Sequence, residues 1–242
     1  MGTHYNNIAD VFNKVWKFSD GYKNWVIENI NSFLQLIPND TLVDIGGGTG
    51  TFTSMLKNVS NVKRAICVEP SSSMCDKARE FNNIECLCED ATTFSQINSI
   101  KYNKVLLKEV VHHIKNREEV WNNFYKQLPS NAKILIITRP QKIQFPLFAS
   151  ALEAFKNNQP PIEELVNELE QSKFKVTYEI KNYTFSLADS EWYMMLENRF
   201  MSDLDQFTDN EIKEGINELK NTHSGDMYEI RDNIIYLVAT KL

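Results

Sequence analysis

The sequence predicts an α/β protein with a largely parallel sheet, and three observations carry this prediction. A short apolar run at 41–45 ends on a cluster of glycines and continues as a helical pattern from residue 51. Four further apolar runs of strand length follow before residue 140, separated by stretches that are long enough for helices. Charged side chains directly follow several of these runs, as expected at the functional edge of a parallel sheet.

Composition is that of a globular protein. The chain has 242 residues, 42% hydrophobic and 24% charged, which suits one α/β domain with a sizeable core. No apolar run approaches the roughly 20 residues that span a bilayer, and the first residues lack a signal-peptide pattern. We therefore expect a soluble, cytoplasmic protein without a membrane partner. The net charge of -6 argues against a nucleic-acid partner, because phosphate backbones need a concentrated basic patch.

Four cysteines, Cys67, Cys75, Cys86 and Cys88, fall close together in the sequence. No CxxC pair or neighbouring histidine completes a known zinc spacing, so we expect reduced thiols in the core and no metal site.

The first forty residues are rich in aromatic side chains. From 25 onward the apolar residues recur at helical spacing, and Pro38 is expected to end that helix. Before this helix, residues 19–21 interrupt the run of aromatic residues. This segment is either a helix pair that covers the core or a lid over a ligand site, with Tyr5 and Tyr22 as polar-tipped contacts.

The glycine turn after 41–45 decides the ligand class. The dinucleotide fingerprint G-x-G-x-x-G fails in both registers, because Thr51 and Thr53 stand where its third glycine would be. Asp44 lies two residues before the first glycine, where its carboxylate would repel a diphosphate and attract an ammonium group. The turn therefore predicts a ligand that is cationic at this point.

Residues 43–50, Val-Asp-Ile-Gly-Gly-Gly-Thr-Gly, resemble motif I of the class I S-adenosylmethionine-dependent methyltransferases without a gap. The resemblance implies S-adenosylmethionine as cofactor and a Rossmann-like sheet of order 3-2-1-4-5-7-6 with strand 7 antiparallel. It also implies that the methionine end of the cofactor is held by Asp44, Gly46, Gly47, Gly48 and Gly50.

A second strand at 63–69 ends on Glu69, which is followed by Pro70. One crossover helix and one strand separate Glu69 from the glycine turn, so its carboxylate is expected beside the turn, where it can accept both hydroxyls of a ribose. A serine cap then opens a helix whose Met74 is placed to pack on adenine.

The third strand, at 84–88, runs into Glu89, Asp90 and Ala91. Asp90 and Ala91 resemble the family's adenine-binding pair, although Glu89 leaves an ambiguity of one residue.

The fourth strand, at 104–107, emerges into Lys108 and the pair His112 and His113. This segment resembles the small-molecule branch that includes ubiquinone/menaquinone-type methyltransferases, and we include Lys108 in the cofactor site. Either histidine, with His113 preferred, is a candidate base, since an unperturbed imidazole titrates near neutral pH. The alternative is a histidine that only orients the loop or the substrate.

An amphipathic helix at 117–128 precedes the fifth strand, 133–138, which ends on Arg139. This cation at the functional edge meets either a substrate anion or a nearby acid.

Beyond 141 we expect helices at 162–172, 189–204 and 208–219, and strands at 174–180 and 233–240. The helices between the last two strands would select the substrate. The candidates to line the acceptor pocket are Trp192, Tyr193, Met194, Met195 and Arg199. Aromatic and methionine side chains at helical spacing more often belong to the hydrophobic core, which is the alternative.

We therefore expect one domain: a helical arm (1–40), a cofactor-binding core (41–140) and a substrate-selecting part (141–242). The expected reaction is methyl transfer to an oxygen or nitrogen of a small molecule. A non-catalytic S-adenosylmethionine sensor or complex subunit, an aminopropyl transferase, and a protein or nucleic-acid methyltransferase are the alternatives. Lys108 disfavours an aminopropyl transferase, since a polyamine needs an acidic groove there. The acceptor and the oligomeric state do not follow from the sequence.

Overall fold

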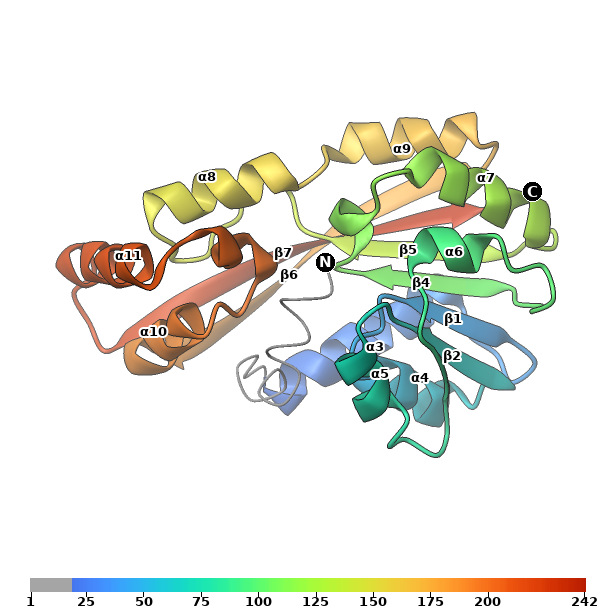
Figure 1. Ribbon diagram of the computed structural model, residues 1–242, viewed down its shortest axis with the longest axis horizontal. Helices are drawn as coiled ribbons and strands as arrows, with labels where there is room; N and C mark the ends of the chain where they lie inside the picture. Colours follow the sequence, from blue (N-terminus) through green and yellow to red (C-terminus); the bar gives the residue numbers. More distant parts are fainter. Residues whose placement is uncertain (1–18) are drawn as a thin grey trace.

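The computed structural model describes residues 19–242 and confirms the α/β fold, with a seven-stranded sheet of order β3-β2-β1-β4-β5-β7-β6 (Figure 1). The first five strands are parallel, and β7 is antiparallel to both β5 and β6. The strands are β1 (Thr41–Ile45), β2 (Arg64–Val68), β3 (Glu85–Leu87), β4 (Lys104–Lys108), β5 (Lys133–Thr138), β6 (Lys175–Ala188) and β7 (Met227–Thr240). The predicted contact Tyr5 and the first part of the predicted arm lie outside the described residues.

Helices cover both faces of this sheet. They are α3 (Asp20–Leu34), α4 (Thr51–Ser60), α5 (Ser72–Ala78), α6 (Ala91–Ser95), the 3-10 helix η1 (Val111–His113), α7 (Arg117–Gln127), α8 (Ala149–Asn158), α9 (Ile162–Gln171), α10 (Asp189–Glu197), the 3-10 helix η2 (Ser202–Gln206) and α11 (Asp209–Thr222). Alternate side chains of each strand point to opposite faces. Val43 of β1 accordingly packs with α6, α7 and α9, whereas its neighbour Leu42 packs with α3 and α4.

The last two strands extend far beyond the sheet edge that the sequence predicts. β6 and β7 pair along all 14 residues of each strand, from Lys175 with Thr240 to Ala188 with Met227. The predicted strands at 174–180 and 233–240 were therefore too short. The added half of β6 alternates Tyr183, Phe185 and Leu187 with the exposed Asn182, Thr184 and Ser186. This is the alternation of a half-buried strand, so the signal was present in the sequence and was missed.

The part of β6 and β7 that extends beyond the parallel strands is a two-stranded ribbon. Helices α8, α10 and α11 pack on this ribbon and form a separate apolar cluster with it, the extension cluster (Figure 1). Trp192, Leu196 and Phe200 are at its centre and are almost fully buried. The cluster holds the segment that was predicted to select the substrate beside the carboxyl edge of the parallel strands.

Three predicted helix boundaries were wrong. α3 begins at Asp20, because the Ser19 hydroxyl accepts the Tyr22 amide at 3.2 Å and caps the helix where an interruption was expected. The same helix ends at Leu34, before Pro38, since Gln35 adopts a left-handed conformation with φ of 52°. The predicted helix at 189–204 stops at Glu197, and Arg199 with φ of 48° turns the chain into η2.

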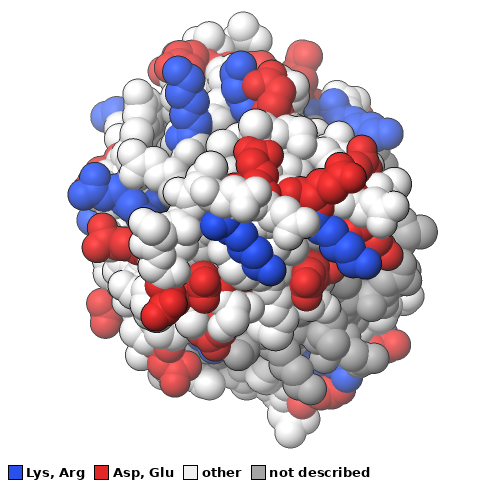
Figure 2. Space-filling model, turned by 90° about the vertical axis from the view of Figure 1, so that its left-hand side faces the viewer, with Lys and Arg blue, Asp and Glu red and all other residues white. Residues whose placement is uncertain are grey.

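In the described part of the chain, no helix combines the length and the apolar composition that crossing a bilayer requires. Figure 2 shows the face at the α10 and α11 end of the molecule, where acidic and basic side chains are interspersed. This face therefore lacks the continuous basic surface that binds nucleic acids.

Candidate active site

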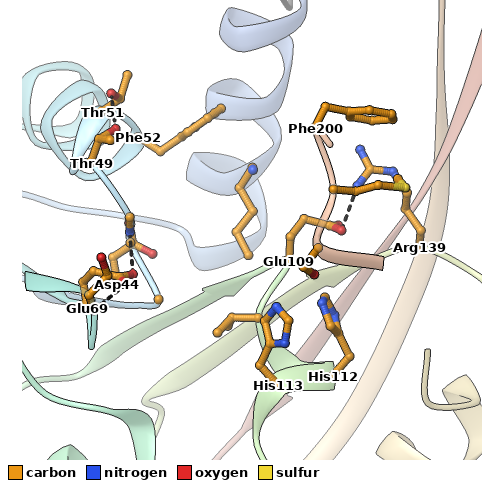
Figure 3. A pocket seen from close by; sticks show the side chains of 18 of the residues that line it. Asp44, Thr49, Thr51, Phe52, Glu69, Glu109, His112, His113, Arg139 and Phe200 are labelled. Carbon is orange, nitrogen blue, oxygen red and sulfur yellow. Dashed lines mark hydrogen bonds and ion pairs between the residues drawn. The ribbon is translucent and has the colours of Figure 1, made fainter. Parts of the chain in front are cut away.

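A cavity of about 350 Å³ opens at the carboxyl ends of β1, β2, β4 and β5 and continues to α8 and to the turn before η2. This volume is in the range of small-molecule sites. Figure 3 shows Asp44 and Glu69 on one side of the cavity and Glu109, His112 and His113 on the other. The cavity therefore joins the predicted cofactor motif to the predicted catalytic segment.

The glycine turn is tight on one side and open on the other. Gly46 has φ of 68°, and a Cβ added there would lie 2.5 Å from the Val110 side chain. Gly48 has φ of 58°, but a Cβ at this position would meet nothing within 4 Å. Both conformations favour glycine, and the open space beside Gly48 lets a ligand approach the backbone.

Asp44 lies under this turn and is almost completely buried. Its Oδ2 accepts a hydrogen bond from the Thr53 hydroxyl at 2.6 Å. Burial raises the pKa of Asp44 to about 6, against the opposing effects of Thr53 and Lys108. The carboxylate is therefore mostly ionised at neutral pH but poorly solvated, and a cationic ligand group would stabilise it.

Glu69 is tied to the turn by both carboxylate oxygens. Oε2 accepts the Gly48 amide and Oε1 accepts the Ser71 amide, each at 3.0 Å. Burial raises the pKa of Glu69, and the two amides oppose that rise. A carboxylate has about four lone-pair sites, so each oxygen can accept one more hydrogen bond from a ligand hydroxyl.

Pro70 and Lys108 also line the cavity, as predicted, and the Lys108 ammonium lies 4.4 Å from the centre of the Phe52 ring. Burial lowers the pKa of Lys108. The structure does not bring Met74, Asp90 or Ala91 to this cavity within the residues it describes. Met74 is buried below the surface, so it is not available to pack on adenine in this structure. Asp90 is exposed and caps α6 by accepting the Thr93 amide at 2.9 Å.

Arg139 belongs to a buried ionic cluster. Its Nε and Nη2 donate to the two oxygens of Asp232 at 2.8 Å each, and its Nη1 lies 2.7 Å from Glu109 Oε2. The Tyr22 hydroxyl donates to Asp232 at 2.8 Å. Arg139 lines the cavity, but two carboxylates already neutralise it, so of the two predicted roles the structure supports pairing with an acid. Tyr22 stabilises this cluster and does not itself line the cavity.

His112 and His113 lie in η1, and both face the cavity with ring centres 4.1 Å apart (Figure 3). Burial, with a further effect of Arg139, lowers the pKa of His112 to about 4. The Thr138 hydroxyl donates to Gln159 Oε1 at 3.1 Å, which leaves Gln159 Nε2 facing His112 Nδ1 at 3.4 Å. His112 is therefore neutral at pH 7, with its proton on Nε2, and it can donate a hydrogen bond into the site.

The substrate-selecting segment does contact the cavity, but not through the predicted residues. Trp192 is buried in the extension cluster, where its Nε1 donates to Pro146 O at 2.7 Å. Arg199 donates to Phe207 O and to Asp209. The turn that follows, with Phe200, Met201, Ser202 and Asp203, lines the cavity instead.

Sequence reasoning missed several lining residues, among them four that matter for the chemistry of the site: Glu109, Phe155, Gln159 and Asp203. Glu109 directly follows a strand, which is the signal that identified Glu69, and could have been found in the same way. The other three come from helices or turns whose placement depends on the extension cluster, so the sequence pattern carried no signal for them.

The four cysteines are free thiols. Among residues 19–242, the histidine, cysteine and acidic side chains form no group with the geometry to hold a metal ion.

Comparison with known proteins agrees with this geometry. Residues 43–134 match the family model described as "Methyltransferase domain". The matched segment is well under half of the chain. No curated protein is similar enough in sequence to count as a relative.

Solved structures with this fold include methyltransferases. A putative methyltransferase from an antibiotic biosynthesis pathway of Anabaena variabilis is 19% identical, with a TM-score of 0.66 and coverage of 90% of this chain and 97% of that one. The cyclopropane synthase MmaA2 of Mycobacterium tuberculosis is 15% identical, with a TM-score of 0.65 and coverage of 99% and 97%. A phosphoethanolamine N-methyltransferase of Haemonchus contortus, in complex with S-adenosylhomocysteine, is 17% identical, with a TM-score of 0.63 and coverage of 98% and 57%. At these identities the likeness shows the fold.

The motif, the family match and the fold together support an enzyme of the class I S-adenosylmethionine-dependent methyltransferases. Residues 43–134 are similar to a methyltransferase domain, and the cofactor that this match and the glycine motif support is S-adenosylmethionine. The residues present fit this cofactor: Asp44 offers a buried carboxylate for an ammonium group, Glu69 offers free acceptor sites for a ribose, and the space beside Gly48 is open.

Proposed function

We propose that this protein transfers the methyl group of S-adenosylmethionine to an oxygen or nitrogen of a small-molecule acceptor. The observation that carries the proposal is the single cavity that joins Asp44 and Glu69 to His112 and His113. The size of the cavity and its enclosure by side chains favour a metabolite over a protein or nucleic-acid substrate. The phosphomonomethylethanolamine bound in the Haemonchus contortus enzyme is a small acceptor of this kind.

The cofactor supplies a methyl group on a positively charged sulfur, so attack by an acceptor lone pair breaks the carbon–sulfur bond and leaves S-adenosylhomocysteine. The protein side of this reaction is positioning and exclusion of water. Asp44 would bind the ammonium of the cofactor's methionine part, Glu69 its ribose hydroxyls, and Lys108 its carboxylate. We keep Asp90 and Ala91 as contacts to adenine.

We assign His113 as the catalytic histidine that accepts the acceptor's proton or aligns the acceptor. His112 is less suited to accept a proton, because the Gln159 amide already occupies its Nδ1. His112 instead donates a hydrogen bond from its Nε2–H group to the acceptor and keeps its proton. The His112 and His113 pair is also the basis on which we propose membership of the ubiquinone/menaquinone-type branch.

Two measurements test the proposal. Calorimetry should show binding of S-adenosylmethionine and no binding of NAD at the same concentration. Incubation with S-adenosylmethionine and pools of small metabolites should form S-adenosylhomocysteine only with pools that contain an acceptor. Binding without any acceptor-dependent product would favour the non-catalytic sensor, and binding of NAD instead would overturn the assignment.

A further inference from the structure

The acceptor half of the cavity contains a buried carboxylate with an unused oxygen. Asp203, in η2, lines the cavity and is only 3% exposed. Its Oδ1 accepts a hydrogen bond from the Asn158 amide at 2.7 Å. Within residues 19–242, no side chain or backbone group donates to its Oδ2. Because Asp203 lines the cavity and only its Oδ1 is engaged in this part of the chain, Oδ2 is available to accept a hydrogen bond from a ligand donor.

Asp203 lies on the side of the cavity opposite the cofactor motif. Asn158, which holds it, ends α8, and the next residue, Gln159, contacts His112. The carboxylate therefore belongs to the same wall as the catalytic segment, away from Asp44 and Glu69.

The charges on this wall leave an excess of carboxylates. Arg139, whose charge acts on His112, is already paired with Asp232 and Glu109. Lys23 also lines the cavity and is paired with the exposed Asp20. His112 adds no positive charge at pH 7. Among residues 19–242, Asp203 is therefore a cavity carboxylate without an ion-pair partner, and an anionic acceptor would meet it and no unpaired guanidinium.

We propose that Asp203 binds a cationic nitrogen group of the methyl acceptor, so that the acceptor is an amine-bearing small molecule with an apolar part. This inference rests on the proposed function and specifies its substrate class. The protonated nitrogen donates to Asp203 Oδ2 and anchors the acceptor. The apolar part packs on Phe155, Phe200 and Met201, which line the same half of the cavity. The atom that receives the methyl group is a separate oxygen or an unprotonated nitrogen, because a protonated nitrogen has no lone pair for the attack.

A matched set of three probes tests this proposal: 2-phenylethylamine (cationic), 2-phenylethanol (neutral) and 3-phenylpropionate (anionic). Binding of each to the complex with S-adenosylhomocysteine is measured by ligand-observed NMR titration into the millimolar range. The wild-type protein should bind the amine more tightly than the alcohol, and the alcohol more tightly than the acid.

The variant Asp203→Asn keeps the shape and can still accept from Asn158, but it lacks the charge. A charge-assisted hydrogen bond contributes about 1.5–3 kcal/mol, so this variant should bind the amine about 10- to 100-fold more weakly and the alcohol equally well. Asp205→Asn is the matched control, since Asp205 is exposed in the same short helix, and it should change neither affinity.

The outcomes separate this inference from the proposed function. Absence of S-adenosylhomocysteine binding by the wild type overturns the proposed function itself. If that ligand binds, the inference is overturned by equal or tighter binding of the acid, by failure of all three probes to bind, or by unchanged amine affinity in Asp203→Asn. A calorimetric titration with S-adenosylhomocysteine shows that each variant is folded.

Discussion

The substitution Asp44→Asn should make the free protein more stable and its cofactor binding weaker. The pKa of Asp44 rises from 3.8 to about 6 on folding, and burial is the main cause. Each pKa unit corresponds to about 1.4 kcal/mol, so the ionised carboxylate costs about 3 kcal/mol of stability at pH 7. An asparagine can still accept from the Thr53 hydroxyl and carries no charge to desolvate.

The pH dependence isolates this effect. Because the pKa is higher in the folded state, the folded protein holds more protons than the unfolded chain between about pH 4 and pH 6. The stability contributed by this group is therefore lost as the pH rises through that window. The difference between Asp44→Asn and the wild type should be close to zero at pH 4 and approach its full value of about 3 kcal/mol at pH 7.

The assay is urea unfolding of both proteins at several pH values, followed by calorimetry with S-adenosylmethionine. Loss of the ion pair with the ammonium group should weaken cofactor binding about 10- to 100-fold. Asp226→Asn, at an exposed position, is the control and should change neither quantity. Destabilisation by Asp44→Asn at pH 7, together with unchanged cofactor affinity, would refute both the electrostatic argument and the placement of the ammonium.

Three further predictions concern the other elements of the site. Glu69→Ala should weaken S-adenosylmethionine binding at least about 100-fold, because two acceptor sites for the ribose are lost; unchanged affinity by calorimetry would remove the ribose assignment. With an acceptor from the metabolite pools, His113→Ala should lower kcat about 100-fold or more and His112→Ala much less, and the reverse order would exchange their roles. Asp232→Asn should cost about 3–5 kcal/mol in urea unfolding, since it removes one of the two carboxylates that pair with the buried Arg139 within residues 19–242; a loss below 1 kcal/mol would show that the pair contributes little to stability.

The parallel half of the fold was predictable because each of its strands is locally distinct. The runs at 41–45 and 133–138 have apolar residues at consecutive positions, Leu42 and Val43 in the first and 134–137 in the second, as buried parallel strands do, and the structure places β1 and β5 at these residues. The glycine turn was predictable for a different reason, since the left-handed conformations at Gly46 and Gly48 favour one residue type. The helix predicted at 208–219 begins at an equally local signal, the capping box that Thr208 and Glu211 form at the start of α11.

The acceptor half of the site was not predictable in this way. Arg139 could be assigned to a sheet edge from the sequence, but its partner Asp232 is 93 residues away and only the pairing of β7 with β5 brings them together. The long ribbon of β6 and β7 likewise decides where the chain between Glu197 and Ser202 turns.

The sequence by itself therefore determined the positions of the strands in the cofactor half, the identity of its turn and the carboxylates that follow its strands, because these depend on contacts within one strand–turn–helix unit. The order of the strands came from the resemblance to the methyltransferase family. Only the tertiary structure decided that Arg139 is neutralised, that Trp192 is core, and that Asp203 faces the cavity. Each of these depends on which distant segments pack together in the low-dielectric interior. An unpaired charge is costly there, so a buried charge is paired with residues that no local sequence pattern identifies.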